Sequence, residues 1–214
     1  MAIGFLNSNE GEYTTWVRWG AKACQWEMGT ENGKTSCNLT QAIFDIENLK
    51  VGWASIQVGQ APQWVFAPNL ETPVARPAGI KVNDRGQDVP LFTNGFSVKV
   101  FSRTSFGDDN VREFATNQKG SLAAINELHT QYEEQKSTNV GKVPVVEFSG
   151  HNYIDNSGKG FGTNVPKLNI IKWVDRPAEL IGDGVVTNSP APQSTLQAAP
   201  VQAAQFAASS ASEF

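Results

Sequence analysis

The chain has 214 residues, of which 40% are hydrophobic and 18% are charged, and its formal net charge at pH 7 is −4. These values are ordinary for one globular domain with a polar appendage, and they exclude a protein whose whole surface is basic. No stretch approaches the roughly 18 consecutive apolar residues that cross a bilayer, so the sequence predicts no membrane span. A polyanion would therefore have to bind to a local basic surface.

The first 34 residues hold three tryptophans, Trp16, Trp19 and Trp26, among glycines and polar residues. A spacing of three would place Trp16 and Trp19 on one side of a short helix or turn. We interpret residues 1–34 as an N-terminal arm that packs on the domain, with direct contact between these rings and a ligand as the alternative. The opening residues have no basic segment followed by an apolar run, so no secretory signal is expected.

Strand and turn signals alternate through the middle of the chain. Apolar and β-branched residues predict strands over 35–46, 51–58 and 63–67, and the last two would merge into one long bent strand. A polar loop with several Pro and Gly residues is expected over 69–90. Strict alternation of apolar and polar residues predicts a further strand over 96–103.

One helix is predicted over 117–135, where apolar residues recur at spacings of three and four and Ser121 can serve as the N-cap. Strands over 143–154 and 165–174 follow it. This order predicts a mainly β protein with the OB fold, a five-stranded β-barrel with one helix between its third and fourth strands. The OB domain would span residues 35–182.

Residues 183–214 are dominated by Ala, Gln, Ser and Pro. Such a segment cannot bury enough apolar surface to offset its chain entropy, so a disordered C-terminal tail is predicted.

The sequence offers no convincing catalytic or metal-binding pattern. The glycine-rich run 158–162 lacks a Ser or Thr after Lys159 and lies between two predicted strands, so it does not make a phosphate loop. Cys24 and Cys37 form no zinc pattern with the two distant histidines, and reduced thiols are expected. We therefore predict a protein that is not an enzyme and that needs no cofactor or metal.

Aromatic residues and cations recur on the polar faces of the predicted strands, which is typical of proteins that bind single-stranded nucleic acid by stacking bases and pairing phosphates. In 96–103, for example, Phe96 and Val98 belong to the core face and Phe101 to the opposite one. The predicted stacking residues are Trp53, Phe101, Tyr153, Phe161 and Trp173, with Trp64 and Phe66 as second choices. The predicted phosphate contacts are Lys99, Arg103, Lys159, Lys167 and Lys172. A β-bulge would invert any of these faces, so packing remains the alternative for each ring.

Three segments carry a resemblance to a known family: KVPVVEFSG at 142–150, GKGFG at 158–162 and VPKLNIIKWVDRP at 165–177. Together they resemble the C-terminal half of the OB-fold single-stranded-DNA-binding proteins of tailed bacteriophages, and the resemblance extends over about 35–177. It implies sequence-nonspecific binding and protection of single-stranded DNA in phage replication and recombination, in the cytoplasm of a bacterial host. The loop with Lys159 and Phe161 would close over the DNA strand.

The end of the chain is similar in design to the acidic, Phe-terminated tips of bacterial single-stranded-DNA-binding proteins. Glu213 and Phe214 stand there, but the tip has one acidic residue where those proteins have several. Recruitment of replication or recombination proteins through these two residues is one hypothesis, and an inert solubilising tail is the other.

Two functions of other classes stay open. A phage structural or assembly protein with a β-barrel body would also be β-rich and slightly acidic. A nuclease would need a cluster of carboxylates and a divalent metal. The sequence leaves open whether the chain forms a homo-oligomer and whether it prefers DNA or RNA.

Overall fold

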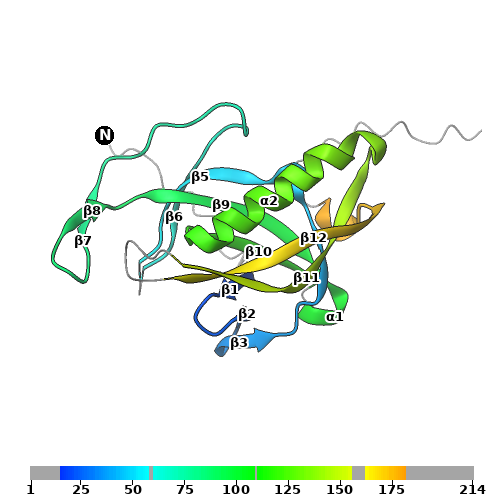
Figure 1. The fold of residues 1–214 in the computed structure, drawn as a ribbon, viewed down its shortest axis with the longest axis horizontal. Coiled ribbons are helices and arrows are strands. Elements are labelled where there is room, and N and C mark those ends of the chain that lie inside the picture. Colours follow the sequence, from blue (N-terminus) through cyan, green and yellow to red (C-terminus); the bar gives the residue numbers. More distant parts are fainter. Residues whose placement is uncertain (1–14, 58–59, 109, 156–161, 182–214) are drawn as a thin grey trace, which may run out of the picture.

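The computed structural model describes residues 15–57, 60–108, 110–155 and 162–181. Within them the chain is mainly β, with one long helix, α2 (Lys119–Gln135), lying across a large curved sheet (Figure 1). The strands of that sheet are β1 (Trp16–Gly20), β2 (Gln25–Thr30), β3 (Gly33–Cys37), β4 (Gln41–Phe44), β5 (Lys50–Ser55), β6 (Gln63–Phe66), β9 (Thr93–Phe101), β10 (Val111–Thr116), β11 (Lys142–Ile154) and β12 (Thr163–Asp175). The shorter elements are η1 (Ile46–Asn48), α1 (Arg103–Phe106), η2 (Lys136–Thr138) and η3 (Ala178–Leu180).

The sheet is mixed, because one of its pairs is parallel. Its strand order is β12-β11-β4-β9-β10-β1-β2-β3. The long strand β9 pairs with β4 near its end and with β5 over its first half, and β5 pairs in turn with β6. All these pairs are antiparallel except β1 with β10, which brings the start of the described chain beside a strand from its middle.

The core lies on the inner face of this curved sheet. Val98 of β9 and Phe114 of β10 form a cross-strand pair there, and both are fully buried. Trp19 of β1 and Trp26 of β2 join them as a T-shaped pair with ring centroids 5.7 Å apart. Burial of rings of this size contributes much of the apolar area that stabilises a small domain.

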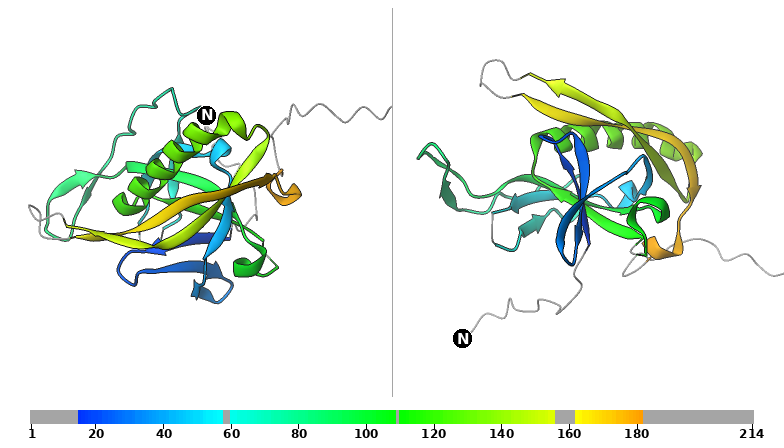
Figure 2. Two further views of the ribbon diagram at one scale, coloured as in Figure 1. Left: turned by 45° about the vertical axis from the view of Figure 1, so that its right-hand side comes forward. Right: turned by 90° about the horizontal axis from the view of Figure 1, so that it is seen from below.

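Helix α2 closes the core along the open edge of β12 (Figure 2). Leu128 and Ile125 face inward from the helix. The side chain of Gln131 donates to the carbonyl oxygen of Leu168 at 3.1 Å and accepts from the amide of Ile170 at 3.0 Å. These bonds satisfy backbone groups that a free sheet edge would leave unpaired.

The predicted helix and the strand over 63–67 are confirmed, but the connections around them differ from expectation. β5 and β6 form an antiparallel hairpin instead of one bent strand. The predicted strand over 35–46 is divided into β3 and β4. The loop over 69–90 contains a separate hairpin of β7 (Ile80–Val82) and β8 (Asp88–Pro90), which projects from the body (Figures 1 and 2).

Two local expectations at the helix were wrong. The sequence predicted no strand between β9 and α2, but β10 lies there. A charged residue, Arg112, interrupts the apolar pattern of its inner face. Arg112 is buried and donates to the carbonyl oxygen of Gly29 at 2.7 Å. Helix α2 begins after Gln118, so Ser121 is a buried residue of the first turn and not the N-cap.

Residues 16–30 contribute two strands to the sheet. Trp16 and Trp19 lie on β1, where a spacing of three puts them on opposite faces, and not on one side of a helix or turn. The boundary expected after residue 34 falls inside β3. No helix in the described part of the chain is long and apolar enough to cross a membrane.

Candidate nucleic-acid interface

The outer face of the sheet, opposite the core, carries aromatic and basic side chains from neighbouring strands. Cross-strand pairs share a face of a sheet, so the register identifies the members of this face. We call it the outer face and define it by Trp64 and Phe66 of β6, Lys50 of β5, Ser97 and Lys99 of β9, Glu113 of β10, and Trp16 and Arg18 of β1.

Trp64 and Phe66 form a stacked pair at one end of the outer face. Their ring centroids are 5.3 Å apart and their planes differ by 13°. The ammonium of Lys50 lies 5.9 Å from the centroid of Phe66. A Cβ on Gly95 would come within 2.8 Å of the Trp64 ring, so the absence of a side chain there lets the indole lie on the sheet. Both rings are half-buried and leave aromatic surface toward solvent.

The middle of the outer face is polar. Lys99 is exposed and stands opposite Glu113 in the β9–β10 register. Ser97 donates a short hydrogen bond to the carboxylate of Glu113, which holds this acid against the sheet. Among the residues that define this face, Glu113 is acidic and three, Lys50, Lys99 and Arg18, are basic. The β1–β2 register places a second carboxylate, that of Glu27, beside Arg18.

Trp16 and Arg18 extend the outer face to β1. The guanidinium carbon of Arg18 lies 5.0 Å from the centroid of the Trp16 ring, a distance typical of a cation–π contact. Trp16 also packs on β2, because a Cβ on Gly29 would come within 2.6 Å of its indole nitrogen. The ring is half-buried, whereas Trp19 on the same strand belongs to the core.

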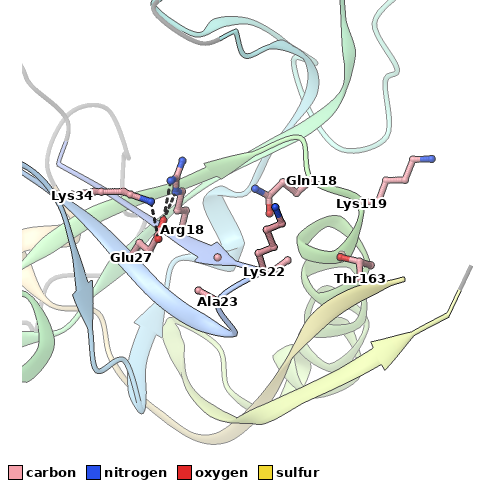
Figure 3. Close-up of a pocket in the computed structure, with 11 residues that line it drawn as sticks. Arg18, Lys22, Ala23, Glu27, Lys34, Gln118, Lys119 and Thr163 are labelled. Atoms are coloured by element: carbon pink, nitrogen blue, oxygen red, sulfur yellow. Dashed lines mark hydrogen bonds and ion pairs between the residues drawn. The ribbon is translucent and has the colours of Figure 1, made fainter. Parts of the chain in front are cut away.

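A hollow of about 650 Å³ adjoins the outer face between the β1–β2 hairpin and the start of α2 (Figure 3). Arg18, Lys22, Lys34 and Lys119 line it, together with one carboxylate, Glu27. Arg18 donates to Glu27 through Nε and Nη2 at 2.9 and 2.8 Å, and Lys34 donates at 2.9 Å. These bonds hold the pKa of the Glu27 carboxyl below its ordinary value, and the bond from Lys34 has the largest effect.

Replacing Glu27 by glutamine is expected to destabilise the protein at neutral pH by about 1–2 kcal/mol, because the charged hydrogen bonds are lost while their partners are half-exposed and screened. A carboxyl whose pKa is lowered by folding contributes stability above its ordinary value of 4.5 and loses it as the pH falls further. Urea unfolding of both proteins at pH 7 and at about pH 3 checks this. The difference should shrink at the lower pH, and an unchanged difference would contradict it.

The structure does not bring the sequence-predicted site residues together. Lys99 lies on the outer face, but Phe101 is only 7% exposed, so the prediction of an exposed ring there was wrong. The guanidinium of Arg103 covers Phe101 at 5.6 Å and pairs with Glu179 of η3 at 3.0 Å. Arg103 itself begins α1 and does not extend β9.

Trp53 lies on the opposite face of β5 from Trp64, because the two belong to adjacent pairs of the β5–β6 register. Its indole nitrogen donates to the carbonyl oxygen of Val74 at 2.8 Å, and Arg76 lies 5.5 Å from its centroid. The connection between β6 and β7 therefore covers part of this ring.

A bulge in β12 explains the position of Trp173. Val145 of β11 pairs with Lys172 and Val146 pairs with Ile170, so one residue of β12 is unpaired and the faces invert beyond it. Trp173 consequently turns to α2, where it packs on Tyr132 at 5.5 Å and donates to Gln135 at 3.1 Å. Lys167 and Lys172 are exposed on β12, away from the outer face.

A second irregularity, between Phe148 and His151 of β11, inverts the end of that strand. His151 therefore packs near Trp19, with ring centroids 6.0 Å apart, and does not share a face with Glu147. Tyr153 is 65% exposed near the end of the β11–β12 hairpin. The predictions for Lys159, Phe161, Glu213 and Phe214 lie outside the described residues.

Sequence reasoning did not select Trp16, Arg18, Lys22, Lys34 or Lys119. The alternation Trp-Val-Arg-Trp-Gly over β1 carried the signal, since it places Trp16 and Arg18 on one face and Val17 and Trp19 on the other. Among the described residues, no group of three His, Cys, Asp or Glu side chains could hold a metal ion.

In comparisons with protein families, with curated proteins and with solved structures, no match to this chain was found.

Proposed function

We propose that this protein binds single-stranded DNA, without sequence preference, on the outer face. The observation that carries the proposal is the stacked pair of Trp64 and Phe66 beside Lys50, on a sheet surface that also presents Lys99, Trp16 and Arg18. Bases of any identity offer a flat π surface, and stacking on an aromatic contributes about 1–3 kcal/mol per base. A base that stacks on this pair extends an arrangement that already exists in the free protein.

The strand order supports an OB-type barrel, which we also propose. β4 and β5, interrupted by η1, would be its first strand, β9 and β10 its second and third, and β11 and β12 its fourth and fifth. The supporting features are the return of β11 to β4 and the place of α2 between β10 and β11. OB folds bind oligonucleotides on the face of their second and third strands, where Lys99 and Glu113 lie here.

The chain departs from a plain five-stranded barrel at β10. Its free edge is taken by β1 in parallel, and β1 in turn contacts β12 where the indole nitrogen of Trp19 donates to the carbonyl oxygen of Asn164 at 2.9 Å. The added strands widen the outer face by β1 and β2. In the phage setting that the sequence resemblance implies, such a face would cover single-stranded replication and recombination intermediates in the bacterial cytoplasm.

Titration of the full chain with oligo-dT, followed by intrinsic tryptophan fluorescence, tests this function. Stacking of bases on Trp64 and Trp16 is expected to quench the emission, and added salt is expected to weaken the binding because phosphates release counterions. A duplex of equal length serves as the control and should quench little. Absence of quenching at micromolar protein and low salt would remove the proposal and favour a structural or assembly role.

A further inference from the structure

The hollow between the β1–β2 hairpin and the start of α2 contains basic side chains that form no ion pair with its one carboxylate. Arg18 and Lys34 are both engaged by Glu27. Lys22 and Lys119 are exposed and form no ion pair within the part of the chain that the structure describes. One carboxylate and four cations thus line the hollow, and two of these cations have no acidic partner among the described residues.

Glu27 holds the shape of this charged surface. Its side chain is 11% exposed and bridges β1 to β3 by accepting from Arg18 and Lys34 on either side (Figure 3). Arg18 and Lys34 keep 43% and 57% of their side-chain surface exposed while bound to it. An anion that enters the hollow would therefore find two cations already positioned and would pay little side-chain entropy for them.

Helix α2 adds to the positive potential. Its first residues, Lys119 and Gly120, line the hollow, and the N-cap residue Gln118 forms no capping hydrogen bond with its side chain. The amino end of a helix carries partial positive charge and unpaired amide groups, which favour anions. A Cβ on Gly120 would stand only 3.3 Å from Val165, so this glycine allows the helix start to approach β12.

The hollow is continuous with the outer face through one residue. Arg18 lines the hollow, and its guanidinium also lies over the Trp16 ring. Four strand spacings separate β6 from β1, which corresponds to about 19 Å along the sheet at about 4.8 Å per strand. Single-strand sites of OB folds extend over roughly 4–16 nucleotides, so one DNA strand can reach both places.

We propose that the hollow binds backbone phosphates of the same DNA strand that stacks on Trp64 and Phe66, with Lys22 and Lys119 as the residues that contact them. The strand would cross the outer face from β6 to β1 and enter the hollow past Trp16. This inference rests on the proposed function. It assigns a DNA-binding role to the β1–β2 hairpin, which lies outside the five strands of the barrel.

The test is the salt dependence of oligo-dT binding by the Lys22→Gln, Lys119→Gln double variant of the full chain. Each phosphate contact contributes about 0.7 to the slope of log K against log salt for single strands, so the variant should lose about 1.4 from the slope. The loss should appear with oligonucleotides of about 16 nucleotides and not with those of about 4, which cover the aromatic pair alone.

The matched control is Lys136→Gln, Lys142→Gln, which removes two exposed lysines beyond the other end of α2. That end is about 25 Å from the hollow along a helix of 17 residues. The control should retain the slope of the unmodified protein. Equal slopes for both variants, in a protein that still binds oligo-dT with quenching, would contradict phosphate binding in the hollow and would leave the proposed function intact. If the unmodified protein does not bind oligo-dT, the proposed function itself is wrong.

Discussion

Replacing Trp64 by alanine is expected to weaken oligo-dT binding by roughly 5- to 150-fold, the equivalent of one stacking contact worth about 1–3 kcal/mol. The indole is the larger ring of the stacked pair, and it lies on a part of the sheet where Gly95 leaves room for it. Trp64→Phe keeps an aromatic surface and should lose much less. Fluorescence anisotropy with labelled oligo-dT at fixed salt measures the change.

Trp53→Ala is the matched control for this expectation. Trp53 is one residue from the Ala54–Trp64 pair but lies on the opposite face of β5, where Val74 and Arg76 contact it. Its replacement should leave affinity within about twofold, a change equivalent to less than about 0.5 kcal/mol. A large loss at Trp53 with none at Trp64 would show that the site predicted from the sequence is correct and that the outer face is not the site. The melting temperature of each variant shows whether the fold is retained.

Replacing Asp45 by asparagine is expected to lower the free energy of unfolding by about 3 kcal/mol. Asp45 pairs with Arg176 at 2.6 Å, and the two side chains are only 2% and 8% exposed. Removing one partner leaves a buried guanidinium with less compensation, which typically costs about 3–5 kcal/mol, and the remaining pair of Arg176 with Glu47 supports the lower figure. For a chain of this size the melting temperature should fall by about 6–12 °C, followed by circular dichroism.

Glu47→Gln provides the comparison, since Glu47 binds the same arginine but is 60% exposed. Its loss should cost about 1 kcal/mol or less. Equal effects of the two substitutions would contradict the importance of burial at Asp45. The double variant Asp45→Asn, Arg176→Met should recover part of the stability, because it removes the unpaired buried charge along with its partner.

The elements with a single clear period of hydrophobic residues were predicted correctly from the sequence. Helix α2 and the inner face of β9 follow from regular spacing of Leu128 with its neighbours and of Val98 with Phe96 and Val100, and all of these are buried as expected. Local pattern also indicated β6, whose Trp64 and Phe66 were second choices for the site. In α2 and β9 a single side of the element is buried against one continuous core, so the hydrophobic pattern carries the information.

The sequence could not show which residues form the candidate site, because strand register and bulges decide which face of the sheet each side chain occupies. Trp173 turned inward at a bulge that moves one residue of β12 out of its pairing with β11. Phe101 follows the alternation of β9, yet the guanidinium of Arg103 covers it, and Glu179 of η3, 76 residues further along the chain, pairs with that guanidinium. Trp16 reached the outer face through a parallel pairing with β10, and no local pattern encodes such a partner.

The parallel pairing of β1 with β10 also bears on how the chain comes to be folded. Trp19 of β1 also donates to Asn164 of β12, a residue 145 positions further along the chain, so at about 5–20 residues per second the ribosome needs roughly 7–30 s to supply this hydrogen-bond partner. During this interval we expect Trp19 and Trp26 to remain accessible on the nascent chain. Contacts between such distant residues also slow folding, since a long loop must close before they form. The element that widens the outer face therefore makes this domain one that completes its fold only after most of it has been synthesised.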